Sequence, residues 1–140
     1  MSAELNDLYQ ELILDHYRNP RGAGEVQGAT HSAAANNPLC GDEILITARV
    51  NDGIIEEVKH RSIGCAICVA SASMMAESAK GRRKEELLSQ SKEFCAFARG
   101  EHSNIDGKLV AFAGVSKFPM RVKCATLAWH TLENALQNGR

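Results

Sequence analysis

The stretch from Glu43 to Met75, EILITARVNDGIIEEVKHRSIGCAICVASASMM, contains the clearest structural signals in the chain. Its first part alternates apolar and more polar residues, with the apolar set at Ile44, Ile46, Ala48 and Val50. A period of two is typical of a strand with one buried face. The tripeptide Asn-Asp-Gly at 51–53 then favours a tight turn into a second strand, IIEEVKHRSI. The stretch therefore predicts a β-hairpin.

The second half of the same stretch changes character at Cys65. From Ala66 to Lys80 the residues are small and apolar nearly all round, and Gly81 follows. A helix without a polar face is normally buried, and glycine commonly follows the last turn of a helix. We therefore expect a buried helix over 66–80 that ends at Gly81.

Apolar residues at helical spacing recur on both sides of this unit. They predict an amphipathic helix from Leu5 to Tyr17, stopped by Asn19, Pro20, Arg21 and Gly22. They also predict an amphipathic helix over 82–99, a helix of one or two turns over 109–115, and a final helix after Pro119.

The segment 23–37 is rich in glycine, alanine and polar residues and has no clear period. We expect an irregular connection there, with one short strand near His31 to Ala34. The order of elements, one helix, a small antiparallel sheet and then helices packed against it, is an α+β pattern.

Length and charge limit the possible functions. With 140 residues, the chain is expected to form a single domain over 1–140. Sixteen basic and seventeen acidic residues nearly cancel, so the net charge provides no general electrostatic attraction for nucleic acid or anionic lipid. The sequence contains no apolar run of about 18 residues and no secretion signal at its N-terminus. We expect a cytoplasmic protein that binds neither nucleic acid nor membrane.

Three of the five cysteines lie where predicted elements begin or end. Cys40 precedes the first hairpin strand, Cys65 joins the second strand to the buried helix, and Cys124 is expected in the first turn of the final helix. Thiolates near a helix N-terminus are stabilised by unpaired backbone N–H groups and by the helix dipole. If packing brings these ends together, the three thiols could bind one metal ion.

Asp42 could complete such a site, because Gly41 alone separates it from Cys40. Zinc prefers four ligands in a tetrahedron, and three thiolates with one carboxylate form a mixed set whose oxygen exchanges most readily. The net charge would be about −2. Arg121 and Lys123, beside Cys124, are the candidates to offset it.

Simpler interpretations apply to the other candidate groups. Cys95 lies in a helical apolar stripe and is expected in the core. Cys65 and Cys68 form a C-x-x-C motif that could be a redox pair, but no βαβ unit surrounds it, so Cys68 is expected to be a packed neighbour. The five histidines have no metal-binding spacing, and surface or packing roles are expected for them.

Four segments together resemble the SufU branch of the IscU/SufU (NifU N-terminal-like) family of iron–sulfur cluster assembly proteins. They are LYQELILDHYRNPRG, NPLCGDEI, SIGCAICVASASMM and RVKCATLAWHTL, in that order. The resemblance implies a three-stranded antiparallel sheet with about five helices packed on one side. It also implies metal ligands at Cys40, Asp42, Cys65 and Cys124.

Two features make the chain similar to SufU rather than to the scaffold-type members. Lys123 stands directly before the ligand cysteine Cys124, where scaffolds usually have histidine. The connection between the ligand cysteines Cys65 and Cys124 is also longer than in the scaffolds. Arg121 matches an arginine of the SufU branch and is expected to support the site. The resemblance implies a zinc-dependent sulfurtransferase that works with a SufS-type cysteine desulfurase and downstream SUF assembly proteins.

Our hypothesis for the reaction is that Cys40 accepts the sulfur of a desulfurase persulfide. The partner would supply a competing ligand, the site would rearrange around Asp42, and Cys40 would leave the zinc. Two alternatives stay open at this point. One is a scaffold that assembles a [2Fe–2S] cluster, or holds iron, on the same ligands, and the other is a purely structural zinc domain.

Overall fold

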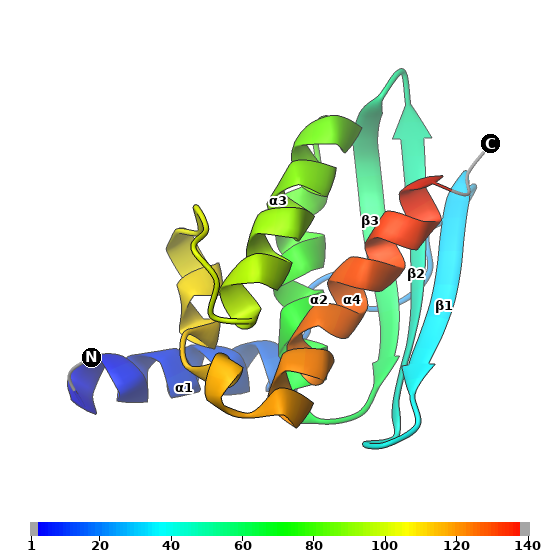
Figure 1. Cartoon of the computed structure of the whole chain (residues 1–140). Helices are drawn as coiled ribbons and strands as arrows, with labels where there is room; N and C mark the ends of the chain where they lie inside the picture. The colour runs from blue at the N-terminus through cyan, green and yellow to red at the C-terminus, as the bar shows by residue number, and fades with distance from the viewer. Residues whose placement is uncertain (1–2, 138–140) are drawn as a thin grey trace.

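A computed structural model describes residues 3–137 of the chain (Figure 1). It contains three strands, four α-helices and two short 3-10 helices: α1 (Ala3–Arg18), β1 (His31–Asn37), β2 (Asp42–Asn51), β3 (Ile54–Ile63), α2 (Ala66–Ala79), α3 (Lys84–Ala98), η1 (Gly107–Phe112), η2 (Val115–Lys117) and α4 (Pro119–Gln137). The predicted α+β architecture is confirmed.

The sheet is antiparallel throughout, in the order β1-β2-β3. The hairpin β2–β3 forms as expected, with Ile46 opposite His60 and an irregularity between Arg49 and Val50. β1 spans seven residues, so the expectation of a short strand at 31–34 within an irregular segment was too short. Its alanines have weak strand propensity, and pairing with β2 determines their conformation instead.

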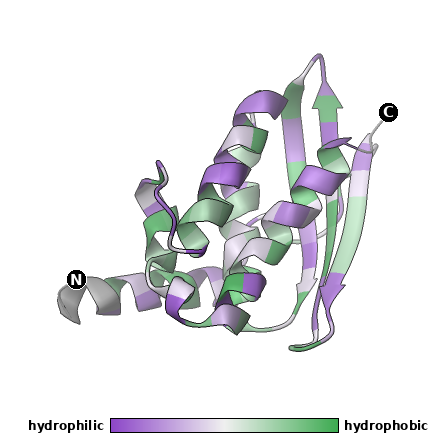
Figure 2. Cartoon of the chain, viewed as in Figure 1, coloured by the Kyte–Doolittle hydropathy of each residue, from purple (hydrophilic) through white to green (hydrophobic). Residues whose placement is uncertain are grey.

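Helices α2, α3 and α4 lie on one side of the sheet, as expected (Figure 1). α4 packs against β1 and β2, and α2 packs against β3 and α4. Ten residues of α2 are buried, in agreement with its apolar composition. The hydropathy colouring in Figure 2 shows hydrophilic segments alternating with hydrophobic ones along α3 and α4, which cover the core with one face each.

An aromatic cluster fills the centre of the helical layer. Phe94 of α3 is fully buried between Phe112 and Trp129, with ring centroids 5.4 Å and 5.1 Å away. The Trp129 indole N–H donates to the Ser71 hydroxyl at 3.1 Å, so its polar atom is also satisfied. This cluster fixes α3 and α4 relative to α2.

The N-terminal helix α1 packs on α2 and η1 rather than on the sheet. Tyr9, Leu12 and Ile13 of its predicted stripe contact the core, whereas Leu8 and Tyr17 are exposed, so the stripe is buried only in part. The side chain of Leu5, also predicted in that stripe, lies outside the described residues.

The predicted short helix over 109–115 is two 3-10 helices, η1 and η2, separated at Gly114 with a φ of 93°. Pro119 is the first residue of α4 rather than the residue before it. Proline suits this position because its missing N–H would have no partner in the first turn. Within residues 3–137, no helix is long and apolar enough to cross a membrane.

Candidate metal centre

The four predicted ligands come from three places that meet at one end of the molecule. Cys40 lies in the turn between β1 and β2, and Asp42 is the first residue of β2. Cys65 immediately precedes α2. Cys124 is the sixth residue of α4, not in its first turn as predicted, because the helix begins at Pro119. Its thiol therefore lies beyond the unpaired N–H groups of the helix start.

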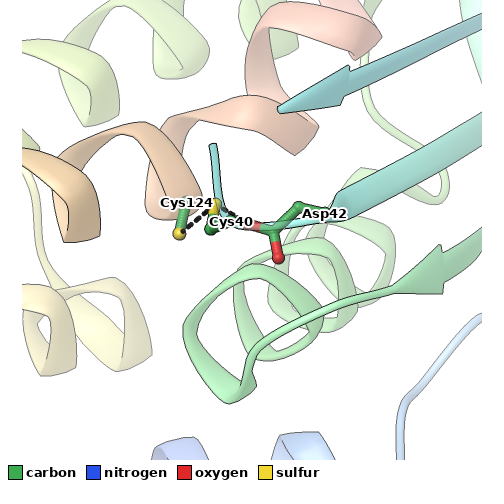
Figure 3. A group of neighbouring side chains, drawn as sticks. All are labelled: Cys40, Asp42 and Cys124. Carbon is green, nitrogen blue, oxygen red and sulfur yellow. Dashed lines mark hydrogen bonds between the residues drawn. The ribbon is translucent and has the colours of Figure 1, made fainter. Parts of the chain in front are cut away.

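Cys40 bridges the other two members of a compact group (Figure 3). Its thiol donates to Asp42 Oδ2 at 3.1 Å, and its Sγ lies 3.4 Å from Cys124 Sγ. The ligand atoms of Cys40, Asp42 and Cys124 all lie within 4.8 Å of one another. The packing of α4 against the sheet thus joins residues that are more than 80 positions apart in sequence.

Cys65 approaches this group through Asp42. Its Sγ lies 3.9 Å from Asp42 Oδ2, and its backbone N–H donates to Asp42 Oδ1 at 3.0 Å. The same sulfur caps α2 by accepting the Cys68 N–H at 3.4 Å. The N–H groups at the helix start therefore orient the Cys65 side chain.

Asp42 is the central acceptor of the site and is fully buried. Burial raises the pKa of its carboxyl group, but hydrogen bonds from Cys124, the Cys65 backbone and Cys40 outweigh this effect. The net pKa of Asp42 therefore lies below the usual range of an aspartate, and the group stays ionised at neutral pH.

Gly64 leaves the space that this carboxylate occupies. A Cβ on Gly64 would overlap Asp42 Oδ1 and lie 2.9 Å from Cγ and 3.0 Å from Cα of Asp42. Only a residue without a side chain fits between β3 and α2 here. This role of Gly64 was not predicted from the sequence, although a glycine directly before Cys65 was a signal for close approach of another part of the chain.

The pKa values of the buried thiols are raised, in the opposite direction to that of Asp42. Burial, together with hydrogen bonding to the Asp42 carboxylate, raises the pKa of Cys124. Burial and the Asp42 charge raise the pKa of Cys68 to about 12. Anionic thiolates beside an anionic carboxylate therefore require a cation to be stable in this site.

The donor set fits a tetrahedral zinc ion. With Zn–S near 2.3 Å and Zn–O near 2.0–2.2 Å, two sulfurs should be about 3.8 Å apart and a sulfur and an oxygen about 3.6 Å apart. The structure has 3.4 Å between the sulfurs of Cys40 and Cys124, and 3.1 Å and 3.9 Å from Asp42 Oδ2 to the sulfurs of Cys40 and Cys65. Small shifts would bring Cys40, Asp42 and Cys124 to metal-binding distances. Cys65 lies outside the group of ligand atoms within 4.8 Å of one another, so its sulfur would have to move further to become the fourth ligand.

Arg121 and Lys123 do not contact this group directly. The Arg121 guanidinium lies over the Phe118 ring, 4.4 Å from its centroid, and both basic side chains are exposed. Within the described part of the chain, no hydrogen bond or ion pair links either residue to Cys40, Asp42, Cys65 or Cys124. Support of the site by Arg121 stays a prediction.

Cys68 and Cys95 lie outside the site. Both thiols are free and buried, as predicted for packed residues. Cys68 is 0% exposed on the inner side of α2, so a Cys65–Cys68 redox pair would have one inaccessible member.

Large apolar side chains are exposed close to the ligands in sequence. We define the apolar rim as Leu39, Ile63, Phe118 and Met120, of which Leu39 and Ile63 are 70% and 67% exposed. Leu39 adjoins Cys40, and Ile63 lies two residues before Cys65. The rim was not predicted from the sequence, although apolar residues beside a polar turn were its signal.

The chain is similar in sequence to known proteins over nearly its whole length. The model of the NifU-like N terminal domain family matches residues 8–138. The zinc-dependent sulfurtransferase SufU of Bacillus subtilis (strain 168) is 44% identical over 138 residues, covering 96% of this chain and 93% of that protein. The iron–sulfur cluster assembly scaffold protein IscU of Streptococcus pyogenes serotype M1 is 36% identical, covering 96% of this chain and 86% of that protein.

A solved structure has the same fold. It is described as a candidate iron–sulfur cluster assembly scaffold protein for the SUF system of Fervidobacterium islandicum. It superimposes with a TM-score of 0.86 at 32% identity, and the match covers 96% of this chain and 99% of that chain.

Proposed function

The chain belongs to the family of NifU-like N-terminal domains, and we propose that it is a zinc-dependent sulfur acceptor in iron–sulfur cluster assembly. It would take persulfide sulfur from a SufS-type cysteine desulfurase and pass it to downstream SUF assembly proteins. The observation that carries the proposal is the compact group of Cys40, Asp42 and Cys124, with the Cys65 sulfur 3.9 Å from Asp42 Oδ2 and with Cys40 on a partly exposed turn.

Zinc, when bound, would keep the cysteine thiols of this group deprotonated at neutral pH. The four groups that would hold it are the predicted ones, three sulfurs and the Asp42 carboxylate. The similarity to a relative named as zinc-dependent supports the same choice of metal.

Cys40 is the best candidate for the sulfur acceptor. Cys124 is buried within α4, and Cys65 is tied to the first turn of α2 through the Cys68 N–H. Cys40 is half-buried in a turn, where the N–H groups of Cys40 and Gly41 both donate to the Asn37 carbonyl at 3.3 Å and 2.9 Å. Such a turn can move without disrupting a helix or the sheet.

The transfer step balances without an external oxidant or reductant. The Cys40 thiolate attacks the terminal sulfur of the partner's persulfide, and a new S–S bond forms at Cys40. The S–S bond of the partner breaks, and its cysteine leaves as a thiolate. Asp42 remains ionised and hydrogen-bonded to the Cys65 N–H, so it can stay in place while Cys40 turns outward.

The exposed side chains of the apolar rim, which are close to the ligands in sequence, support contact with a protein partner. Exposed apolar side chains beside a reactive group are typical of interaction surfaces. Arg121, which lies over the ring of the rim residue Phe118, adds an exposed cation that a partner could contact. We propose that the desulfurase binds here.

The test combines sulfur mapping with desulfurase kinetics. The zinc-loaded protein is incubated with a SufS-type cysteine desulfurase and cysteine, and added sulfur is located by mass spectrometry. We expect a persulfide on Cys40 that disappears in Cys40→Ala, together with stimulation of the desulfurase. Cys68→Ala is the matched control, because this thiol is buried and should not accept sulfur.

The alternative function is a scaffold on which a [2Fe–2S] cluster is assembled. Its support is the similarity to proteins named as assembly scaffolds, which are also related over most of this chain. Absence of added sulfur and of desulfurase stimulation, with a stable cluster formed on reconstitution with iron and sulfide, would reject the acceptor in favour of the scaffold.

A further inference from the structure

A second group of metal-ligating side chains lies between α3 and α4. Cys95 Sγ of α3 is 4.0 Å from His130 Nε2 of α4, and His130 Nδ1 is 3.6 Å from Glu133 Oε1. One ligand atom from each of the three residues can be chosen within 4.8 Å of the others. His130 is six residues beyond Cys124 on α4, roughly 9 Å along the helix axis, so this group is separate from the candidate metal centre.

The two helices hold these residues in fixed relation. His130 and Glu133 are three residues apart and therefore share one face of α4. Helix α3 packs beside α4 (Figure 1), and across this contact Cys95 Sγ lies close to His130 Nε2. The Ser91 hydroxyl lies 3.0 Å from Glu133 Oε1, and such a neighbour restrains the orientation of a ligating carboxylate.

We propose that Cys95, His130 and Glu133 form a second, weaker binding site for a divalent transition metal ion of the zinc type. Thiolate, imidazole and carboxylate are each ligands that zinc accepts in proteins, whereas magnesium and calcium prefer oxygen ligands alone. Three protein ligands would leave a fourth position to water. The family comparisons assign no role to these three residues.

The exposure of the three side chains suits entry of an ion from solvent. Cys95 is the buried member of the group, with 3% exposure, whereas the Glu133 and His130 side chains are 20% and 56% exposed. In a tetrahedral zinc site the sulfur and nitrogen ligands should be about 3.6 Å apart. A small rotation of the exposed His130 ring would close the observed 4.0 Å.

The charges also balance. On binding, the Cys95 thiol would lose its proton to solvent, and one thiolate and one carboxylate would neutralise a divalent cation. A neutral complex is less costly to bury than an isolated charge. The competing interpretation is that His130 and Glu133 form only an ordinary i, i+3 pair beside a core cysteine, with no affinity for metal.

Cobalt titration of the full-length protein distinguishes the two. The protein is first loaded with one equivalent of zinc and then titrated with Co²⁺, which should not displace zinc from the tighter site. Thiolate-to-cobalt charge-transfer absorption and elemental analysis after dialysis report binding. We expect the wild type to bind a second equivalent of metal, as Co²⁺. The affinity for this ion should be at least about ten-fold weaker in His130→Gln. The charge-transfer band should be absent in Cys95→Ser.

His102→Gln is the matched control, since it removes an exposed histidine outside the group and should bind like the wild type. In Cys40→Ser the second site should keep its affinity, which separates this proposal from the function proposed for the first site. If the wild type binds no second ion, or binds it equally well in His130→Gln, the proposal is wrong. His130 is exposed, so this variant should fold even if Cys95→Ser does not.

Discussion

Replacing Gly64 by alanine should damage the metal centre without touching a ligand. Gly64 has a φ of 154°, and an added Cβ would overlap Asp42 Oδ1 and lie 2.9 Å from Cγ and 3.0 Å from Cα of Asp42. Because Cα belongs to the backbone of β2, the side chain of Asp42 cannot relieve the whole overlap by rotation. Either the carboxylate or the junction between β3 and α2 must shift.

The cost has two parts. Backbone strain at an unfavourable φ is of order 1–3 kcal/mol, and overpacking in a tight region adds typically 1–3 kcal/mol. We therefore expect the free energy of unfolding to fall by about 2–6 kcal/mol. Displacement of Asp42 would also weaken its 3.0 Å hydrogen bond from the Cys65 N–H. Hydrogen bonds to charged groups contribute about 1.5–3 kcal/mol, so zinc affinity should fall about ten- to a hundred-fold.

Two assays separate these effects. Urea unfolding of the metal-free protein measures stability, and competition with a chromophoric chelator measures zinc affinity under conditions where the variant is folded. Gly22→Ala is the control, because its Cβ would lie 2.6 Å from Ala76 Cβ, between the end of α1 and α2. It should lose stability and retain zinc affinity. Normal zinc affinity in folded Gly64→Ala would refute the reasoning.

Three further predictions concern the core, an unused thiol and pH. Phe94→Ala should lower the free energy of unfolding by about 3–5 kcal/mol, measured by urea denaturation, because the ring is fully buried; a loss below about 1 kcal/mol would contradict this packing. Cys68 should resist iodoacetamide in the native protein at pH 8, followed by mass spectrometry, because burial raises its pKa to about 12; rapid alkylation would show that α2 opens. Burial lowers the pKa of His60 in the folded protein, so below about pH 6.5 the unfolded chain binds more protons at this residue than the folded protein does. The free energy of unfolding should therefore fall on acidification from pH 7 to 5. For this group the fall is at most about 1.4 kcal/mol per pH unit. His60→Gln should flatten this dependence, and an unchanged slope would assign it to other groups.

The hydrogen bonds of His60 explain why protonation of its ring should destabilise the folded protein. Its Nε2 donates to the Arg21 carbonyl at 2.9 Å, and its Nδ1 lies 2.7 Å from the Ser62 hydroxyl. The neutral ring satisfies both contacts inside the protein. Protonation must charge a buried group, so the native state loses stability as pH falls through the ordinary range of histidine titration.

Local sequence patterns were sufficient to predict much of the fold. The hairpin β2–β3 and the buried helix α2 follow from periods of two and from uniform apolarity, which depend only on neighbouring residues. β1 was underestimated because its alanines carry little intrinsic preference, and only its partner strand gives them extended structure. The start of α4 was misplaced because proline is compatible with both the last residue before a helix and its first turn.

The sequence by itself determined which residue types could form a metal centre, because thiols, a carboxylate and a flexible turn are chemical properties of the chain. Tertiary structure alone decided which of them meet. Docking of α4 on the sheet brings Cys124 to Cys40, and docking of α3 on α4 brings Cys95 to His130, while Arg121 turns instead to Phe118. These contacts join residues far apart in the chain or depend on side-chain packing, and neither is encoded in a local period.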